Sequence, residues 1–423
     1  MPIFIILESP AGPVNPGRIP LPVDFAFPGR YFKGKSTKSR TMKKVKILAV
    51  FGTRPEIIKL FPVIRELKRH SREASLTLCL TAQHRELILP FLKNFDIQPD
   101  HDLKVMSRDQ TSSCVASLVL ARLEPVIHTE RPDLVMVQGD TTTAAAAALC
   151  AFYSRVRVAH VEAGLRTFDP GQPFPEEINR TLVGAVADLH FAPTLRAKRN
   201  LLEAGVPSRR VCLTGNPVID ALRLIPDRPL TGGPLGRALK QDGGGSKIIL
   251  VTAHRRENLG RPLANICRAL QILQERFAGQ ARFVFPVHLN PHVRETVYPA
   301  LSGLKGITLL PPLDYFSLVA LMRRSYCLLT DSGGLQEEAP SFGKPVLVLR
   351  EVTERPEAVE AGAARLVGTD TGRIVRETSR LLLDAGAYRK MAKAVNPFGD
   401  GRAARRIAAV LLGKPWTPFR ARF

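Results

Sequence analysis

The chain lacks the patterns that mark membrane-spanning, zinc-dependent and common nucleotide-cofactor proteins. No stretch of its 423 residues approaches the roughly 20 consecutive apolar residues that span a bilayer, and the N-terminus has no charged segment followed by a clean apolar core. His-Glu-x-x-His is absent, and beyond residue 41 neither Gly-x-Gly-x-x-Gly nor Gly-x-x-x-x-Gly-Lys-Ser/Thr occurs. We therefore expect a soluble, cytoplasmic protein with no membrane insertion, no metal site and no nicotinamide or ATP cofactor.

Cysteine pairs and aromatic residues are also scarce. The six cysteines show no Cys-x-x-Cys spacing and mostly lie in apolar runs, which predicts reduced, buried thiols and no disulfides. Aromatics make up 6% of the chain and do not alternate with basic residues, so the net charge of +23 does not by itself indicate nucleic-acid binding. A field of this sign also gathers phosphorylated substrates.

The first 41 residues differ from the remainder of the chain. They are rich in proline and glycine, then in lysine, arginine and serine, and show no sustained periodicity. We expect a disordered or non-native extension there. An apolar strand follows Met42 directly, and we hypothesise that translation begins at that methionine, which intact-mass measurement of native protein would test.

Beyond this extension, apolar runs rich in β-branched residues alternate with helical patterns. Such alternation is typical of parallel sheets built from βαβ units. A glycine-rich break at 241–246 separates two similar series of runs. The sequence thus predicts an α/β fold with two Rossmann-like domains, at 42–214 and 215–396, with the active site in the cleft between them. A last helix, at 402–414, could pack on either domain, and we expect it to pack back on the first. The predicted strands are 46–50, 76–81, 134–137, 156–161, 189–192 and 211–214, then 247–252, 283–286, 307–310, 327–330, 346–349 and 364–367.

The most informative stretch is the run from Phe51 to Lys59, which follows the first of these strands. Gly-Thr ends the strand, and Arg54, Pro55 and Lys59 begin the next helix. Free backbone N–H groups and two cations then lie where a doubly wound sheet binds anions, which indicates a phosphorylated ligand. The alternative for this stretch taken alone is an ordinary βα turn.

A comparable turn occurs in the second series, at Asp331–Glu338. The backbone N–H groups of Ser332, Gly333 and Gly334 would point at a diphosphate, and Glu338 would reach ribose hydroxyls. The alternative is that Ser332 only caps a helix and Glu338 is a solvated helix residue.

Titratable residues follow other strand ends. His254 and Arg255 follow the strand at 247–252, where an imidazole could donate to a phosphoryl oxygen. In the first series Asp140, Glu162 and Glu176 converge on one cleft. Neighbouring carboxylates take different pKa values, as acid/base chemistry requires. For each carboxylate alone, a helix cap or an ion pair to Arg166 or Arg180 is the alternative.

Taken together, these segments resemble the non-hydrolysing UDP-N-acetylglucosamine 2-epimerases of bacteria, which share the two-domain fold of GT-B glycosyltransferases. The resemblance covers residues 42 to 412 and rests on FGTRPEIIK, TAQHRE, QGDTTT, HVEAGLRT, FPEEINR, HFAPT, TGNPVIDAL, TAHRREN, FPVHLNP, DSGGLQEEAPSFGKPVLVLRE, TERPEAV and NPFGDG. It implies reversible conversion of UDP-N-acetylglucosamine to UDP-N-acetylmannosamine without metal or cofactor, through a 2-acetamidoglucal. It also implies a homodimer and a role in surface polysaccharide synthesis.

The resemblance implies roles for individual residues as well. Asp140, Glu162 and Glu176 look like the acid/base set, with His254 beside the departing phosphoryl group. A second, regulatory UDP-N-acetylglucosamine is implied next to the active site, in contact with Gln83, Arg255 and His288. Some members have Gln where this chain has Glu86, and Gln and Phe near the uracil where it has Leu313 and Leu318. The implied UDP-binding set is Arg54, Lys59, His254, Ser332, Gly333, Gly334, Glu338 and Arg355.

Three other functions stay open at this point. A hydrolysing relative would release N-acetylmannosamine and UDP from the same elimination. A GT-B transferase would pass the sugar to an acceptor, although the convergent carboxylates and the lack of an evident acceptor groove count against it. A basic nucleic-acid-binding protein would show salt-dependent retention on DNA that survives UDP.

Overall fold

The computed structural model describes residues 43–83, 85–107, 110–227, 235–236 and 245–420; the predicted extension at 1–41 lies outside them. Strands and helices alternate through both series. The first contains β1 Val45–Phe51, α1 Arg54–Arg69, β2 Ala74–Leu80, α2 Arg85–Asn94, β3 His101–Asp102, α3 Ser112–Glu130, β4 Leu134–Gln138, α4 Thr142–Tyr153, β5 Arg157–Val161, α5 Glu176–Val186, β6 Leu189–Ala192, α6 Leu195–Glu203, β7 Val211–Leu213 and α7 Pro217–Leu224. The second contains β8 Lys247–Thr252, α9 Arg261–Arg276, β9 Ala281–Pro286, α10 Pro291–Leu301, β10 Ile307–Leu310, α11 Tyr315–Arg324, β11 Cys327–Thr330, α12 Gly333–Glu338, β12 Val346–Val348, α13 Pro356–Glu360, β13 Ala364–Leu366, α14 Thr371–Leu383, α15 Ala385–Ala392 and α16 Ala403–Leu411.

The strands form two parallel sheets, and both have Rossmann-type order. The first sheet runs β3-β2-β1-β4-β5-β6-β7 and the second β10-β9-β8-β11-β12-β13. This confirms the predicted fold class. In each sheet the order reverses beside the first strand of its series, between β1 and β4 and between β8 and β11. Ligands of doubly wound sheets bind at such switch points, outside the carboxyl ends of the strands.

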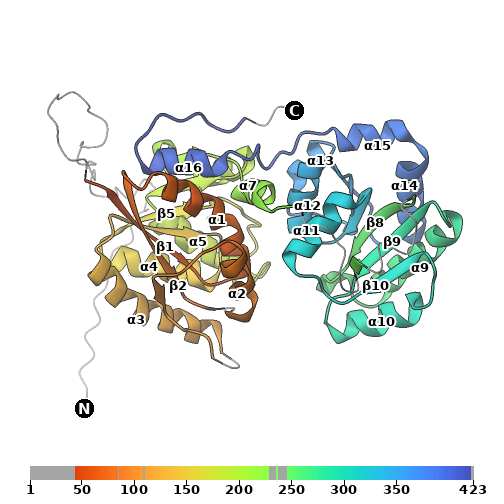
Figure 1. Ribbon diagram of the computed structural model, residues 1–423, viewed down its shortest axis with the longest axis horizontal. Coiled ribbons are helices and arrows are strands. Elements are labelled where there is room, and N and C mark those ends of the chain that lie inside the picture. Colours follow the sequence, from red (N-terminus) through yellow and green to blue (C-terminus); the bar gives the residue numbers. More distant parts are fainter. Residues whose placement is uncertain (1–42, 84, 108–109, 228–234, 237–244, 421–423) are drawn as a thin grey trace, which may run out of the picture. The chain divides into compact units, whose positions relative to one another are not determined.

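The last helix returns to the first series of elements. Although α16 is last in the chain, it packs against α1 and α7 (Figure 1). Asp220 on α7 holds it there, because its carboxylate accepts hydrogen bonds from the free backbone N–H groups of Ala403 (3.1 Å) and Ala404 (3.0 Å) at the start of α16. Burial raises the pKa of Asp220 to about 6.

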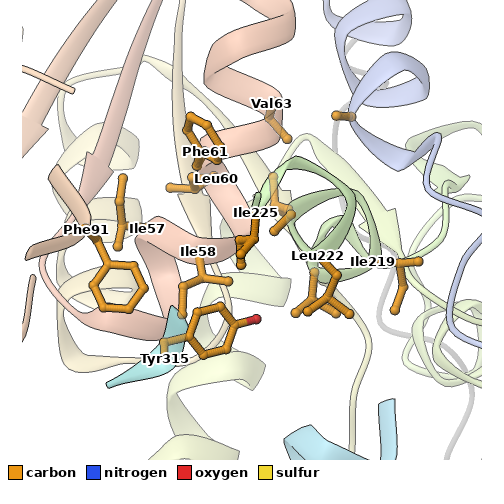
Figure 2. Close-up of a cluster of buried hydrophobic side chains, with 14 of the residues drawn as sticks. Ile57, Ile58, Leu60, Phe61, Val63, Phe91, Ile219, Leu222, Ile225 and Tyr315 are labelled. Carbon is orange, nitrogen blue, oxygen red and sulfur yellow. The ribbon is translucent and has the colours of Figure 1, made fainter. Parts of the chain in front are cut away.

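The buried side chains of α1 and α7 form one apolar cluster that extends to α2 and α11 (Figure 2). Phe91 of α2 lies with its ring centroid 5.8 Å from that of Tyr315 and 5.2 Å from that of Phe316, both of α11. Elements of both sheets therefore share this core. None of the helices in the described ranges is both long and apolar enough to cross a membrane.

Candidate active site

The turn after β1 is organised by a buried carboxylate. Glu56 accepts hydrogen bonds from the backbone N–H groups of Gly52 (2.9 Å) and Thr53 (2.7 Å) and from the Thr141 hydroxyl (2.7 Å). Burial raises the pKa of Glu56, and the hydrogen bonds, which act to lower it, do not outweigh burial. The same carboxylate thus joins the turn before α1 to the turn before α4 and fixes where α1 begins, which sets the position of Arg54.

Lys59 on α1 forms an ion pair with Glu162, which follows β5. The Lys59 ammonium lies 2.7 Å from Oε1 and 2.5 Å from Oε2 of Glu162, and the side-chain amides of Gln138 and Asn216 also donate to this carboxylate. Burial favours the neutral form of each partner, but the ion pair outweighs burial: the pKa of Lys59 is raised and that of Glu162 is lowered. Glu162 is therefore a fully hydrogen-bonded anion before substrate arrives.

A second buried carboxyl group, Glu337 of α12, lies on the other side of Asn216. The Asn216 amide donates to Glu337 Oε2 at 2.8 Å and to Glu162 Oε1 at 2.9 Å. The Arg355 guanidinium forms an ion pair with Glu337 Oε1. Burial raises the pKa of Glu337 despite Arg355, and the Glu162 charge adds to that rise. The two carboxyl groups are thus held in different electrostatic states, as acid/base chemistry requires.

The other predicted carboxylates lie at the same edge of the first sheet. Asp140, in the turn after β4, pairs with Arg180 of α5, whose Nε lies 3.0 Å from Oδ2; this is the ion pair considered as an alternative from sequence. Asp140 also contributes to the field that raises the pKa of Lys59. Glu176 is the first residue of α5 and is half-buried. Within the described residues no hydrogen bond or ion pair links Glu176 to Asp140, Glu162 or Lys59.

His254 follows β8 and is oriented by Asp331, which follows β11. Nδ1 of His254 lies 3.1 Å from Asp331 Oδ1, and Asp331 Oδ2 accepts from the backbone N–H groups of His254 (2.7 Å) and Arg255 (2.8 Å) and from Asn258 Nδ2 (3.0 Å). Burial raises the pKa of Asp331, but these contacts outweigh it and hold the pKa below its usual value. The ring of His254 also stacks on that of His288, with ring centroids 5.5 Å apart.

Lys59 and His254 line a cavity of about 450 Å³, within the range of small-molecule sites. The cavity wall does not include the predicted carboxylates Asp140, Glu162 and Glu176. Glu338 lines the cavity; the Tyr315 hydroxyl donates to Oε1 at 3.2 Å, while Oε2 is buried and has no hydrogen-bond partner among the described residues. Burial raises the pKa of Glu338 to about 8. Figure 2 shows Tyr315 beside Ile58, another residue of the cavity wall. The polar part of the wall includes Arg54, Lys59, Thr252, His254, His288, Tyr315, Ser332 and Glu338.

Most of the predicted UDP-binding set lines this cavity, and the exceptions lie close by. Gly334 lines it with Ser332, and a Cβ at Gly333 would lie 3.6 Å from the Arg255 guanidinium. Arg355 is not part of the wall and pairs with Glu337 instead.

The remaining predicted residues divide between the two sheets. Leu313 and Leu318 line the cavity together with His288. Gln83 accepts a hydrogen bond from the Thr143 hydroxyl (2.8 Å) at the carboxyl edge of the first sheet, whereas Arg255 lies 3.6 Å from Glu354.

Sequence reasoning missed Asn216, Glu337, Asp331 and Tyr315 as members of the site. Each belongs to or adjoins a segment that was singled out, but nothing in the local pattern distinguishes a residue that contacts another functional side chain from its neighbours. In the described part of the chain, no three His, Cys, Asp or Glu side chains are placed to hold a metal ion together.

Two Rossmann-type sheets with a cavity lined by residues that follow their strands define a protein of the GT-B architecture. Within that architecture the chain belongs to the UDP-N-acetylglucosamine 2-epimerase family, whose sequence profile matches residues 65–412. The chain is 48% identical over 372 residues to the UDP-N-acetylglucosamine 2-epimerase of Escherichia coli K12, covering 87% of this chain and 98% of that protein.

Solved structures of relatives agree. The UDP-GlcNAc 2-epimerase of Neisseria meningitidis, bound to UDP-GlcNAc, matches with a TM-score of 0.78 and 44% identity over 87% of this chain and 100% of that one. The Methanocaldococcus jannaschii enzyme, in complex with UDP-GlcNAc and UDP, matches with a TM-score of 0.69 and 33% identity over 87% and 99%.

Proposed function

We propose that this chain interconverts UDP-N-acetylglucosamine and UDP-N-acetylmannosamine by inverting C2 of the sugar. The observation that supports the proposal is the ion pair between Lys59, which lines the cavity, and the buried Glu162, because it would join a cation for the phosphate to a carboxylate for proton transfer. Family membership supports the same substrate.

The chemistry explains why two kinds of group are needed. The C2 hydrogen is not next to a carbonyl, so direct deprotonation is too costly. Removal of the C2 proton as the C1–O bond breaks leaves a C1=C2 double bond in 2-acetamidoglucal, and UDP departs with the electron pair of that bond. Return of UDP to C1, with protonation of C2 from the other face, gives the epimer. Water must be excluded, since it would make the reaction hydrolytic.

The UDP moiety is assigned to the cavity. Arg54, Lys59 and His254, with the backbone N–H groups at the start of α12, would neutralise the diphosphate. Glu338 Oε2 would accept a hydrogen bond from a ribose hydroxyl, which gives a partner to a buried oxygen that has none within the described part of the chain.

The bound diphosphate would also change the acid/base group. Two of the three N–H donors of Lys59 face Glu162, so a bound diphosphate would compete with Glu162 for this cation and draw it away from the carboxylate. Loss of Lys59 removes the main charge that holds the pKa of Glu162 down, and the carboxylate becomes a stronger base only when substrate is present. Asp140 and Glu176 are the other members of the proposed acid/base set.

The remaining assignments rest on family resemblance. Gln83, Arg255 and His288 are assigned to a regulatory UDP-N-acetylglucosamine site, supported by the stacking of His288 on His254. A homodimer, the domain bounds 42–214 and 215–396, and a role in surface polysaccharide synthesis stay predictions.

The test is incubation with UDP-N-acetylglucosamine in D₂O containing EDTA, followed by proton NMR of H1 and H2. We expect UDP-N-acetylmannosamine with deuterium at C2. Free N-acetylmannosamine plus UDP would instead indicate the hydrolysing reaction, and an unchanged sugar would contradict the proposal and direct the search to transferase acceptors.

A further inference from the structure

Asn216 lies between the carboxyl groups of Glu162 and Glu337 and has no role in the reaction proposed above. It is the N-cap of α7, and its Oδ1 accepts a hydrogen bond from the backbone N–H of Val218 at 3.1 Å. This contact uses the carbonyl side of the amide, so the NH₂ side must face away from the helix. That side reaches Glu162 Oε1 at 2.9 Å and Glu337 Oε2 at 2.8 Å, and Asn216 is 1% exposed.

The two carboxyl groups come from different sheets. Glu162 follows β5 of the first sheet and has a backbone φ of +63°, which few non-glycine residues adopt, and Glu337 belongs to α12, which follows β11 of the second. A single amide group therefore joins the carboxyl edges of the two sheets inside the site.

The segment 396–398, which precedes α16, forms hydrogen bonds to Asn216 and Glu337. The backbone N–H of Asn216 donates to the Phe398 carbonyl at 2.6 Å, and the side chain of Asn396 donates to the Glu337 carbonyl at 2.9 Å. Asn216 and Glu337 are thus both attached to the same short segment of chain, residues 396–398.

We propose that Asn216 is a positioning residue that clamps Glu162 to Glu337, so that the acid/base carboxylate stays in place when the diphosphate of the substrate draws Lys59 away. The clamp rests on the proposed epimerase function. Once Lys59 has left, Gln138 and Asn216 are the remaining side-chain donors to Glu162 among the described residues, and of these two only Asn216 connects it to the second sheet.

The charges around the clamp make its loss measurable. Lys59, Asp140, Glu337 and Arg355 act electrostatically on this cluster from α1, the turn after β4, α12 and the N-cap of α13. Without the amide, two buried carboxyl groups would face each other with no donor between them. Buried carboxylates in that situation share a proton, so a pH profile reports the loss.

Two substitutions separate clamping from helix capping. Asn216→Ser keeps a capping oxygen but is too short to reach the carboxylates, and Asn216→Asp keeps the size and the cap but replaces the donor with a third carboxylate. We expect kcat to fall by about 100-fold in both, as for a misplaced catalytic group, while KM changes by less than about threefold. Asn216→Asp should also shift the acidic limb of the kcat–pH profile upward.

The matched control is Asp370→Asn, the same exchange of amide and carboxylate at the N-cap of α14, where Oδ1 accepts from the backbone N–H of Arg373. It should leave kcat, KM and the pH profile unchanged. Urea unfolding of each variant checks folding; if Asn216→Ser does not fold, Asn216→Asp carries the test because it retains size and cap.

The decisive measurement is a double-mutant cycle of Asn216→Asp with Glu337→Gln. Removing one of the crowded charges should recover about tenfold or more of the lost kcat and restore the position of the acidic limb. Additive effects with an unshifted profile would overturn the clamp and leave Asn216 as a helix cap. Wild-type protein is assayed first: wild-type inactivity contradicts the epimerase function, whereas an active wild type with additive variants contradicts only the clamp.

Discussion

Replacing Glu338 with Gln should remove a loss of stability that the wild-type protein shows as the pH rises. The pKa of this carboxyl is about 8 in the folded protein, against an ordinary value of 4.5, because it is buried in the cavity wall. Between these values the unfolded chain ionises and the folded chain does not, so the folded state loses about 1.4 kcal/mol of stability per pH unit. The loss begins near pH 4.5 and is complete above pH 8.

Gln has the same size as Glu and never ionises. The free energy of unfolding of Glu338→Gln, relative to that of wild type, should therefore increase as the pH rises. The gain should be about 2 kcal/mol between pH 6 and pH 8. Urea unfolding at half-unit pH steps measures it. Glu295→Gln is the matched control, because Glu295 is a largely exposed glutamate whose side chain keeps 71% of its accessible surface.

Binding of UDP should lower the pKa of Glu338, whereas burial raises it. A ribose hydroxyl donating to Oε2 favours the ionised form, so UDP should release a proton from wild type near pH 7.5. Calorimetry in buffers of different ionisation enthalpy measures this proton release, because the binding enthalpy then changes from buffer to buffer. The release should be smaller in Glu338→Gln, and this variant should also bind UDP more weakly. A stability difference that is constant with pH, together with equal proton release, would refute this account of Glu338.

Three further outcomes are expected. Glu162→Gln and Asp140→Asn should each lower kcat by about 10²-fold or more, with UDP affinity changed far less, as measured by steady-state kinetics and calorimetry; unchanged turnover in both would remove them from the acid/base set. Gly164→Ala should destabilise the protein by several kcal/mol more than Gly205→Ala, since both have positive φ but only at Gly164 would the Cβ meet a backbone carbonyl, at 2.2 Å; equal losses in urea unfolding would contradict this. Asp220→Ala should weaken the attachment of α16 by about 1–2 kcal/mol, detected as faster amide exchange in that helix; exchange as slow as in wild type would refute the cap.

Much of the fold could be predicted because each strand carries its own local signal. Twelve predicted runs correspond to strands, with ends that differ by a few residues. The strand that was missed, β3, has only two residues, His101 and Asp102, and exists only through pairing with Cys79 and Leu80 of β2. A strand that short leaves no periodicity to detect.

The sequence by itself determined which segments end at strand edges and which chemical groups they bring there: cations after β1, carboxylates after β4 and β5, and an imidazole after β8. Strand ends, turn glycines and charged residues are local features, so they are visible in order along the chain.

Only the tertiary structure decided which of these groups meet. Lys59 and Glu162 are 103 residues apart, and Asn216 and Glu337 are 121 apart. Such contacts depend on strand order and on how the two sheets face each other, neither of which leaves a local trace. The same burial that brings these groups together also shifts their pKa values.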